Sequence, residues 1–175
     1  ELSQKIFNDG SKYTKLDYTG DPKTLQVGTV IQDPVESTLR NNATWAENNQ
    51  NPIGFAQWVK KVLPRQEWDF KNDPNWNDLT YNWNGLTLTA EDLGNLNYGY
   101  TGAALGLSEE MVMLGNAGAN ALFGKIKSPV YGPGLGDSLD DTFYVNLGYQ
   151  YYQTGSFEEA VKMAYAYVIS DCCNN

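Results

Sequence analysis

The chain of 175 residues is 41% hydrophobic and 19% charged, a composition typical of one globular domain rather than of a disordered segment. Its formal net charge is −9, and it contains no cluster of basic residues. Because phosphate contacts require lysine and arginine side chains, we expect no nucleic-acid partner. No apolar run reaches the ~20 residues that a membrane span needs, so we expect no membrane partner either.

Histidine is absent from the chain. Its absence excludes Ser-His-Asp triads, Cys-His pairs, His-His acid–base schemes and most zinc sites. The two cysteines, Cys172 and Cys173, are too few for zinc, and the preceding Asp171 disfavours a reactive thiolate. We interpret them as structural or as part of a tail junction. Neither a metal nor a cofactor is expected, which leaves carboxylates, lysines and tyrosines as catalytic groups.

In chain order, residues 1–34 are expected to form an irregular segment that packs on the domain, with one short strand at 23–31. A helix is predicted over residues 35–49. Pro52 opens a second helix and Pro64 ends it. The apolar side of this second helix, which we expect to face the core, comprises Ile53, Phe55, Trp58, Val59 and Val62.

The segment 67–85 contains three tryptophans and no helical period, which makes it a candidate binding wall. Residues 79–88 alternate enough to predict a hairpin that turns around Trp83-Asn84-Gly85. Further helices are predicted from Thr89, from Ser108 and from two capping boxes, Ser138-x-x-Asp141 and Ser156-x-x-Glu159. The sequence therefore predicts a mainly α fold of about six helices with a minor β-hairpin, as a single compact catalytic domain and a monomer.

The helix from Thr89 is unusually rich in glycine. Leu96, Gly99, Ala103 and Gly106 lie within about 40° of Asp92 around the helix, so one face is nearly bare. Each interior glycine costs ~1 kcal/mol relative to alanine, which requires either a closely packed second helix or a ligand along the backbone. We favour a sugar polymer on this stripe with the acid Asp92 at its head. The alternative is that Thr89-x-x-Asp92 forms a capping box and that Asp92 only ends the helix.

Other carboxylates are candidates for a second catalytic group. Asp137 has no capping explanation, whereas Asp140 suits a helix dipole and Asp141 suits a cap. Asp69 lies between two aromatic residues and precedes Lys71, and an ion pair with a nearby lysine or plain solvent exposure is its alternative. Separated carboxylates among many aromatic rings, without histidine or metal, favour glycoside hydrolysis.

Three stretches then resemble a known family: Trp68-Asp69-Phe70-Lys71, Asp92-x-Gly94-Asn95-x-x-Tyr98-Gly99-x-x-Gly102 and Gly136-Asp137-x-x-Asp140. Over about residues 35–155 the chain resembles the bacterial polymorphic toxin type 44 domain. It also resembles fungal secreted muramidases whose catalytic domain is joined to an SH3-like module. That resemblance implies cleavage of the β-1,4 bond between N-acetylmuramic acid and N-acetylglucosamine in peptidoglycan, and a C-terminal cell-wall-binding module. The sequon Asn42-Ala43-Thr44 agrees with secretion.

The resemblance also assigns roles to individual residues. It implies that Asp92 is the leading catalytic acid and that Asp137 or Asp140 is the second carboxylate. Substrate contacts are expected from Asp69, Lys71, Asn95, Tyr98, Trp83 and Asp141, with Glu67 and Glu91 as reserve acids. Two other functions stay open: a toxin-type ribonuclease effector and a non-catalytic carbohydrate-binding domain.

Overall fold

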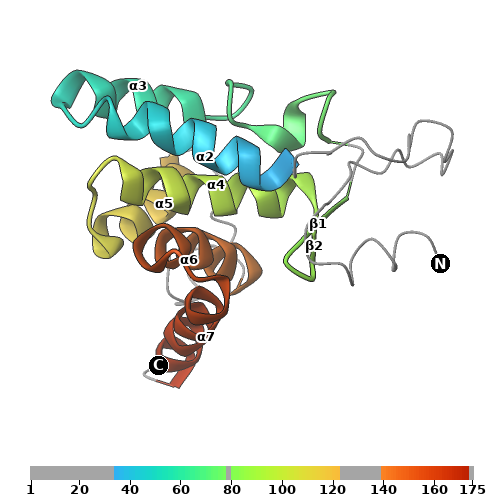
Figure 1. The fold of residues 1–175 in the computed structure, drawn as a ribbon. Helices are drawn as coiled ribbons and strands as arrows, with labels where there is room; N and C mark the ends of the chain where they lie inside the picture. Colours follow the sequence, from blue (N-terminus) through green and yellow to red (C-terminus); the bar gives the residue numbers. More distant parts are fainter. Residues whose placement is uncertain (1–33, 78–79, 123–138, 174–175) are drawn as a thin grey trace, which may run out of the picture.

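The computed structural model describes residues 34–77, 80–122 and 139–173 (Figure 1). Within these residues, six α-helices, one 3₁₀ turn and a two-stranded antiparallel sheet form one domain, which confirms the predicted mainly α fold with a minor β-hairpin. The irregular N-terminal segment and the strand expected at 23–31 lie outside the described residues. The elements are α2 (Pro34–Glu47), α3 (Pro52–Val62), η2 (Phe70–Asn72), β1 (Tyr81–Trp83), β2 (Leu86–Leu88), α4 (Ala90–Ala104), α5 (Glu109–Leu122), α6 (Leu139–Thr154) and α7 (Phe157–Cys173).

Helix α4 runs through the centre of the domain, and ten of its fifteen residues are buried. It packs against α2 on one side and α6 on the other, and α7 covers α6 (Figure 1). Leu93 and Leu96 are fully buried in the main core together with Leu39 of α2 and Leu147 of α6. Removal of these apolar side chains from water is what holds the three helices together.

The crossing of α4 and α6 depends on two glycines. A Cβ atom at Gly99 would lie 1.9 Å from the carbonyl oxygen of Val145, and one at Gly148 would lie 2.0 Å from that of Leu96. The space beside Gly102 is also occupied, because a Cβ there would lie 2.7 Å from the Val112 side chain of α5. The expectation that a sugar polymer rests on this stripe is therefore wrong: neighbouring helices occupy it, which was the alternative that the sequence left open.

Two buried polar side chains of α4 are paired with side chains of α2 and α3. By contrast, Oδ1 of the buried Asn146 in α6 has no hydrogen-bond partner among the described residues. The buried amide of Asn97 accepts a hydrogen bond from Asn42 Nδ2 at 2.9 Å, and the buried Thr101 hydroxyl accepts one from Trp58 Nε1 at 2.9 Å. These bonds tie α2 and α3 to α4, since buried polar groups need partners. Asn42 Nδ2 is also the atom to which an N-linked glycan would attach, so the sequon contributes to an internal contact.

The predicted hairpin is confirmed, with Tyr81 opposite Leu88 and Trp83 opposite Leu86. Asn84 and Gly85 connect the strands with φ values of +48° and +85°, as a two-residue turn with both central residues at positive φ requires. Trp83 is 0% exposed, and its Nε1 donates to Glu36 Oε2 at 3.1 Å. The expectation that Trp83 contacts substrate is therefore wrong, because a ring without exposed surface cannot stack on a sugar.

Helix α3 departs from its prediction in another way. Asn51 caps it by accepting from the backbone N–H groups of Ile53 and Gly54, and Pro52 occupies the first turn as expected. Of its apolar side only Trp58 is buried, whereas Ile53 is 71% exposed and Phe55 is 41% exposed. The apolar side of α3 thus serves two surfaces: Trp58, Val59 and Val62 pack on the core and also line a cleft, which Phe55 lines as well.

Candidate active site

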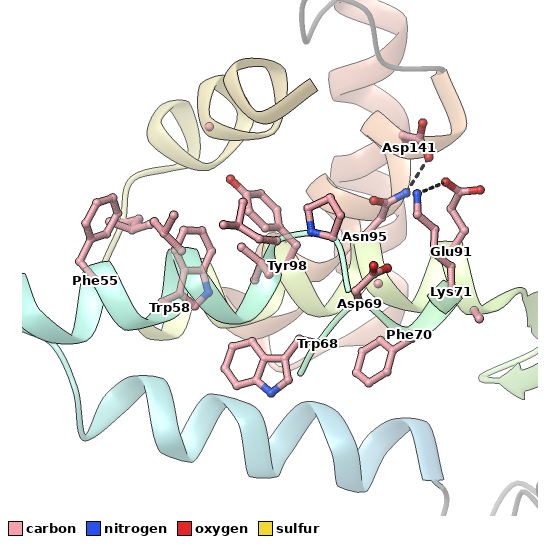
Figure 2. A pocket seen from close by; sticks show the side chains of 18 of the residues that line it. Phe55, Trp58, Trp68, Asp69, Phe70, Lys71, Glu91, Asn95, Tyr98 and Asp141 are labelled. Carbon is pink, nitrogen blue, oxygen red and sulfur yellow. Dashed lines mark hydrogen bonds and ion pairs between the residues drawn. The ribbon is translucent and has the colours of Figure 1, made fainter. Parts of the chain in front are cut away.

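A cleft of about 260 Å³ lies between α3, η2 and α4, with α5 and the start of α6 completing its walls (Figure 2). This volume is near the lower end of the range for small-molecule sites. Its two ends differ in chemistry. Figure 2 shows the rings of Phe55 and Trp58 at one end and the side chains of Lys71, Glu91 and Asp141 at the other.

The apolar part of the lining comes from three helices and from the connection between α4 and α5: Phe55, Trp58, Val59, Val62, Tyr98, Leu107 and Met111. The Trp58 and Tyr98 rings have centroids 4.9 Å apart, and the Tyr98 hydroxyl donates to the carbonyl oxygen of Val112 at 3.2 Å. Gly115 makes room for that hydroxyl, because a Cβ at Gly115 would lie 2.6 Å from it. The aromatic wall is thus fixed in place by a hydrogen bond and by the absence of one side chain.

The polar end carries three carboxylates: Asp69, Glu91 and Asp141. Lys71 Nζ lies 2.8 Å from Glu91 Oε1, which links η2 to α4. Asn95 Nδ2 donates to Asp141 Oδ1 at 2.6 Å, which links α4 to α6. Side chains from three separate elements are therefore joined around one end of the cleft.

Asp69 is the most enclosed of these carboxylates, at 9% exposure. Its Oδ2 accepts from the backbone N–H of Arg65 at 2.5 Å and from Asn72 Nδ2 at 2.6 Å. Its Oδ1 receives no hydrogen bond from any described residue. Arg65 has a φ of +63°, a strained conformation for a residue other than glycine, and such strain concentrates at functional sites. The chain therefore holds one oxygen of Asp69 and leaves the other available to a ligand.

The loop that carries Asp69 is anchored by the neighbouring tryptophan. Trp68 is 5% exposed and meets Trp45 of α2 edge-on, with ring centroids 5.5 Å apart. Lys61 Nζ lies 5.1 Å from the centroid of Trp68 and also pairs with Glu67. Lys61 thus helps to position the loop. Within the described residues, ion pairs join Lys61 to Glu67 and Lys71 to Glu91, in place of the pair with Asp69 that the sequence allowed.

Five of the predicted site residues thus line the same cleft, although they are spread over 73 positions of the chain: Asp69, Lys71, Asn95, Tyr98 and Asp141. The reserve acid Glu91 joins them, whereas the other reserve, Glu67, is exposed and outside the lining. Sequence reasoning missed the contribution of α3. Its apolar stripe was visible, but the same pattern serves a core face and a cleft wall, so the sequence could not distinguish them.

The predicted acid Asp92 lies outside the lining of the cleft. Its Oδ2 accepts from both the backbone N–H and the hydroxyl of Thr89 at 2.8 Å, and its own N–H donates to Thr89 Oγ1 at 3.2 Å. These bonds are the capping box that was the alternative explanation for this residue. The catalytic role of Asp92 stays a prediction, but its carboxylate is engaged at the helix end.

Asp140, the other predicted carboxylate within the described residues, is absent from the lining of the cleft. Asp140 is exposed in the first turn of α6, where its charge suits the helix dipole. Burial, reinforced by the charges of Asp92 and Asp140, raises the pKa of Tyr144, which indicates that both carboxylates are near that ring. Asp137 and the Ser138 cap lie outside the described residues.

Among residues 34–77, 80–122 and 139–173, no three carboxylate or thiol side chains gather as metal ligands. No described helix is both long enough and apolar enough to cross a membrane.

Comparison with known proteins identifies one family. A family model described as bacterial toxin 44 matches residues 57–154. This span includes Trp58, η2, α4 and Asp141, and therefore every residue of the polar end of the cleft. No curated protein and no solved structure matches the chain. Because the matched residues make up more than half of the 175, the protein belongs to the bacterial toxin 44 family.

Proposed function

We propose that the protein is a muramidase-type glycoside hydrolase that cleaves the β-1,4 bonds of bacterial peptidoglycan, with Asp69 and Asp141 as its reacting carboxyl groups. The observation that carries the proposal is the composition of the cleft, which has three carboxylates at one end and aromatic rings at the other. Glycoside hydrolysis needs a protonated carboxyl to donate to the leaving oxygen and an ionised one to activate water or to trap the sugar cation. Phe55, which is 41% exposed, supplies a ring face on which a sugar ring can stack.

Asp69 and Asp141 are favoured over Glu91 by their surroundings. Asp69 is enclosed beside Trp68, and no described residue hydrogen-bonds its Oδ1, so this oxygen is placed to contact a bound substrate. Asp141 is half-buried and oriented by Asn95 from the opposite element. Glu91 is exposed and neutralised by Lys71, which suits a wall residue better than a proton donor.

The net charge of −9 and the absence of a basic cluster disfavour a polyphosphate such as RNA, whose phosphates need lysine and arginine contacts, and this leaves a glycan as the better-supported substrate. Degradation of the wall would also give a bacterial toxin domain its harmful effect. Because peptidoglycan lies outside the bacterial cell membrane, the protein would act in the extracellular space. It would act as a monomer, assisted by a C-terminal wall-binding module.

The test is hydrolysis of purified peptidoglycan, measured by the appearance of reducing ends. Asp69→Asn keeps the size of the side chain and an acceptor for the Arg65 N–H, so the fold is preserved while the carboxyl is lost. Loss of a general acid or base lowers the rate by about 10²- to 10⁴-fold. The matched control is Glu110→Gln, which removes an exposed carboxylate of α5 outside the cleft and should leave the rate unchanged.

The same preparation is incubated with RNA and with insoluble peptidoglycan. Degradation of RNA without new reducing ends would show the ribonuclease alternative to be correct. Sedimentation with the wall without any turnover would show the carbohydrate-binding alternative to be correct. If Asp69→Asn retains full wall-cleaving activity, Asp69 is not a reacting group.

A further inference from the structure

Gly94 is the one glycine of α4 with open space beside it. An added Cβ would meet no atom within 4 Å, and Gly94 lies in the lining of the cleft. In the same helix, α6 occupies the space beside Gly99 and α5 occupies the space beside Gly102. Glycine destabilises a helix interior relative to alanine, and no packing within the described part of the chain requires it at this position. The open space therefore calls for a reason other than helix packing.

The position of Gly94 within the cleft supplies that reason. Residues three and four apart share a helix face, so Gly94 lies on the same face as Glu91 before it and Tyr98 after it. All three line the cleft, and Glu91 belongs to the polar end while Tyr98 stacks on Trp58 at the apolar end. Bare backbone thus separates the carboxylates from the aromatic wall, with Asn95 and its partner Asp141 immediately beside it.

We propose that Gly94 is a specificity-determining position at which the substrate lies directly against the backbone of α4. This inference rests on the proposed function and adds where the glycan is recognised: one sugar ring lies over Gly94, between the carboxylates and the aromatic wall. A side chain at this position would occupy part of the cleft beside the α4 backbone. It would displace the substrate and so move the scissile bond away from Asp69 and Asp141.

The experiment compares Gly94→Ala and Gly94→Leu with the wild-type chain in two measurements. Thermal unfolding reports stability, and hydrolysis of purified peptidoglycan reports function. Since Gly94 is helical and unobstructed, Gly94→Ala should raise the unfolding midpoint by about 2–4 °C. Gly94→Leu should lower kcat/KM by about 10²-fold through displacement of the substrate, with a smaller loss for Gly94→Ala. The control Ala56→Leu introduces the same leucine side chain at an exposed position of α3 outside the cleft and should leave kcat/KM unchanged.

Two results would overturn the inference while leaving the proposed function intact. One is an active wild-type chain whose kcat/KM for peptidoglycan is matched by both Gly94→Ala and Gly94→Leu. The other is a lower unfolding midpoint for Gly94→Ala, which would reveal a packing role for the glycine. Failure of the proposed function appears earlier and separately, as a wild-type chain that releases no reducing ends from peptidoglycan, and the inference falls with it.

Discussion

On the side of α4 that faces α6, Gly99 leaves no space for even a methyl group, whereas on the cleft side Gly94 faces open space. The same residue type thus has two different physical consequences within one helix. At the crossing, glycine allows two backbones to approach so closely that Gly99 and Gly148 each contact a carbonyl oxygen of the other helix. At the cleft, glycine adds volume to a site. A glycine-rich helix is therefore informative only when the neighbour of each glycine is known.

The largest effect that this comparison predicts is at the crossing. Gly148→Ala places a Cβ 2.0 Å from the carbonyl oxygen of Leu96, and backbone on both sides cannot yield without separating α4 from α6. Overpacking of a core usually costs ~1–3 kcal/mol and occasionally more, and we expect ~3 kcal/mol or more here. Urea denaturation measures this loss in the free energy of unfolding. A Gly148→Ala variant as stable as wild type would show that the crossing is looser than the structure indicates.

A smaller effect is expected at the N-terminus of α4. Asp92→Ala removes the carboxylate half of the capping box, so we expect a loss of ~1 kcal/mol in the free energy of unfolding. Activity per folded molecule should be retained, because Asp92 lies outside the lining of the cleft. Denaturation and peptidoglycan hydrolysis, measured on the same samples, separate the two roles. A loss of activity much larger than the unfolded fraction would restore Asp92 as the catalytic acid.

The packed side of the molecule should also be sensitive to alkali. Burial, with a contribution from Asp73, raises the pKa of Tyr81 to about 12, and burial with a hydrogen bond to Glu47 raises the pKa of Tyr152 to about 12. The usual tyrosine value is 10.0, so the folded protein holds these protons more tightly than the unfolded chain does. The stability that the neutral phenols contribute is complete below pH 10 and is lost as the pH rises through 12.

We therefore expect unfolding on the alkaline side between these two values, observed by circular dichroism together with phenolate absorbance. Tyr152→Phe cannot ionise and should reduce the loss of stability over that interval. In the wild-type protein the Tyr152 hydroxyl donates a hydrogen bond to Glu47 Oε1 at 2.8 Å, so the variant should also lose a little stability at neutral pH. Phenolate absorbance that develops fully near pH 10 in the folded protein would contradict the assigned burial.

Local signals in the sequence determined most of the secondary structure of this protein. Asn51-Pro52, Thr89-x-x-Asp92 and Asn84-Gly85 each satisfy backbone groups or dihedral angles within a few residues, so helix starts and the hairpin turn follow from the chain alone. The negative net charge disfavoured a nucleic-acid partner, and the absence of histidine excluded histidine-dependent catalysis, without reference to a fold.

Tertiary structure decided which of these features serve a site. Trp83 and Trp68 look alike in sequence and both belong to the core, yet only Trp68 of the two also lines the cleft. Asp69, Glu91 and Asp141 line one cleft only through the packing of η2, α4 and α6. The carboxylate of Asp92 is instead bonded at the helix end to Thr89, three residues before it. Burial and proximity are properties of contacts between distant segments, and for that reason residue type and spacing could nominate the carboxylates but could not select among them.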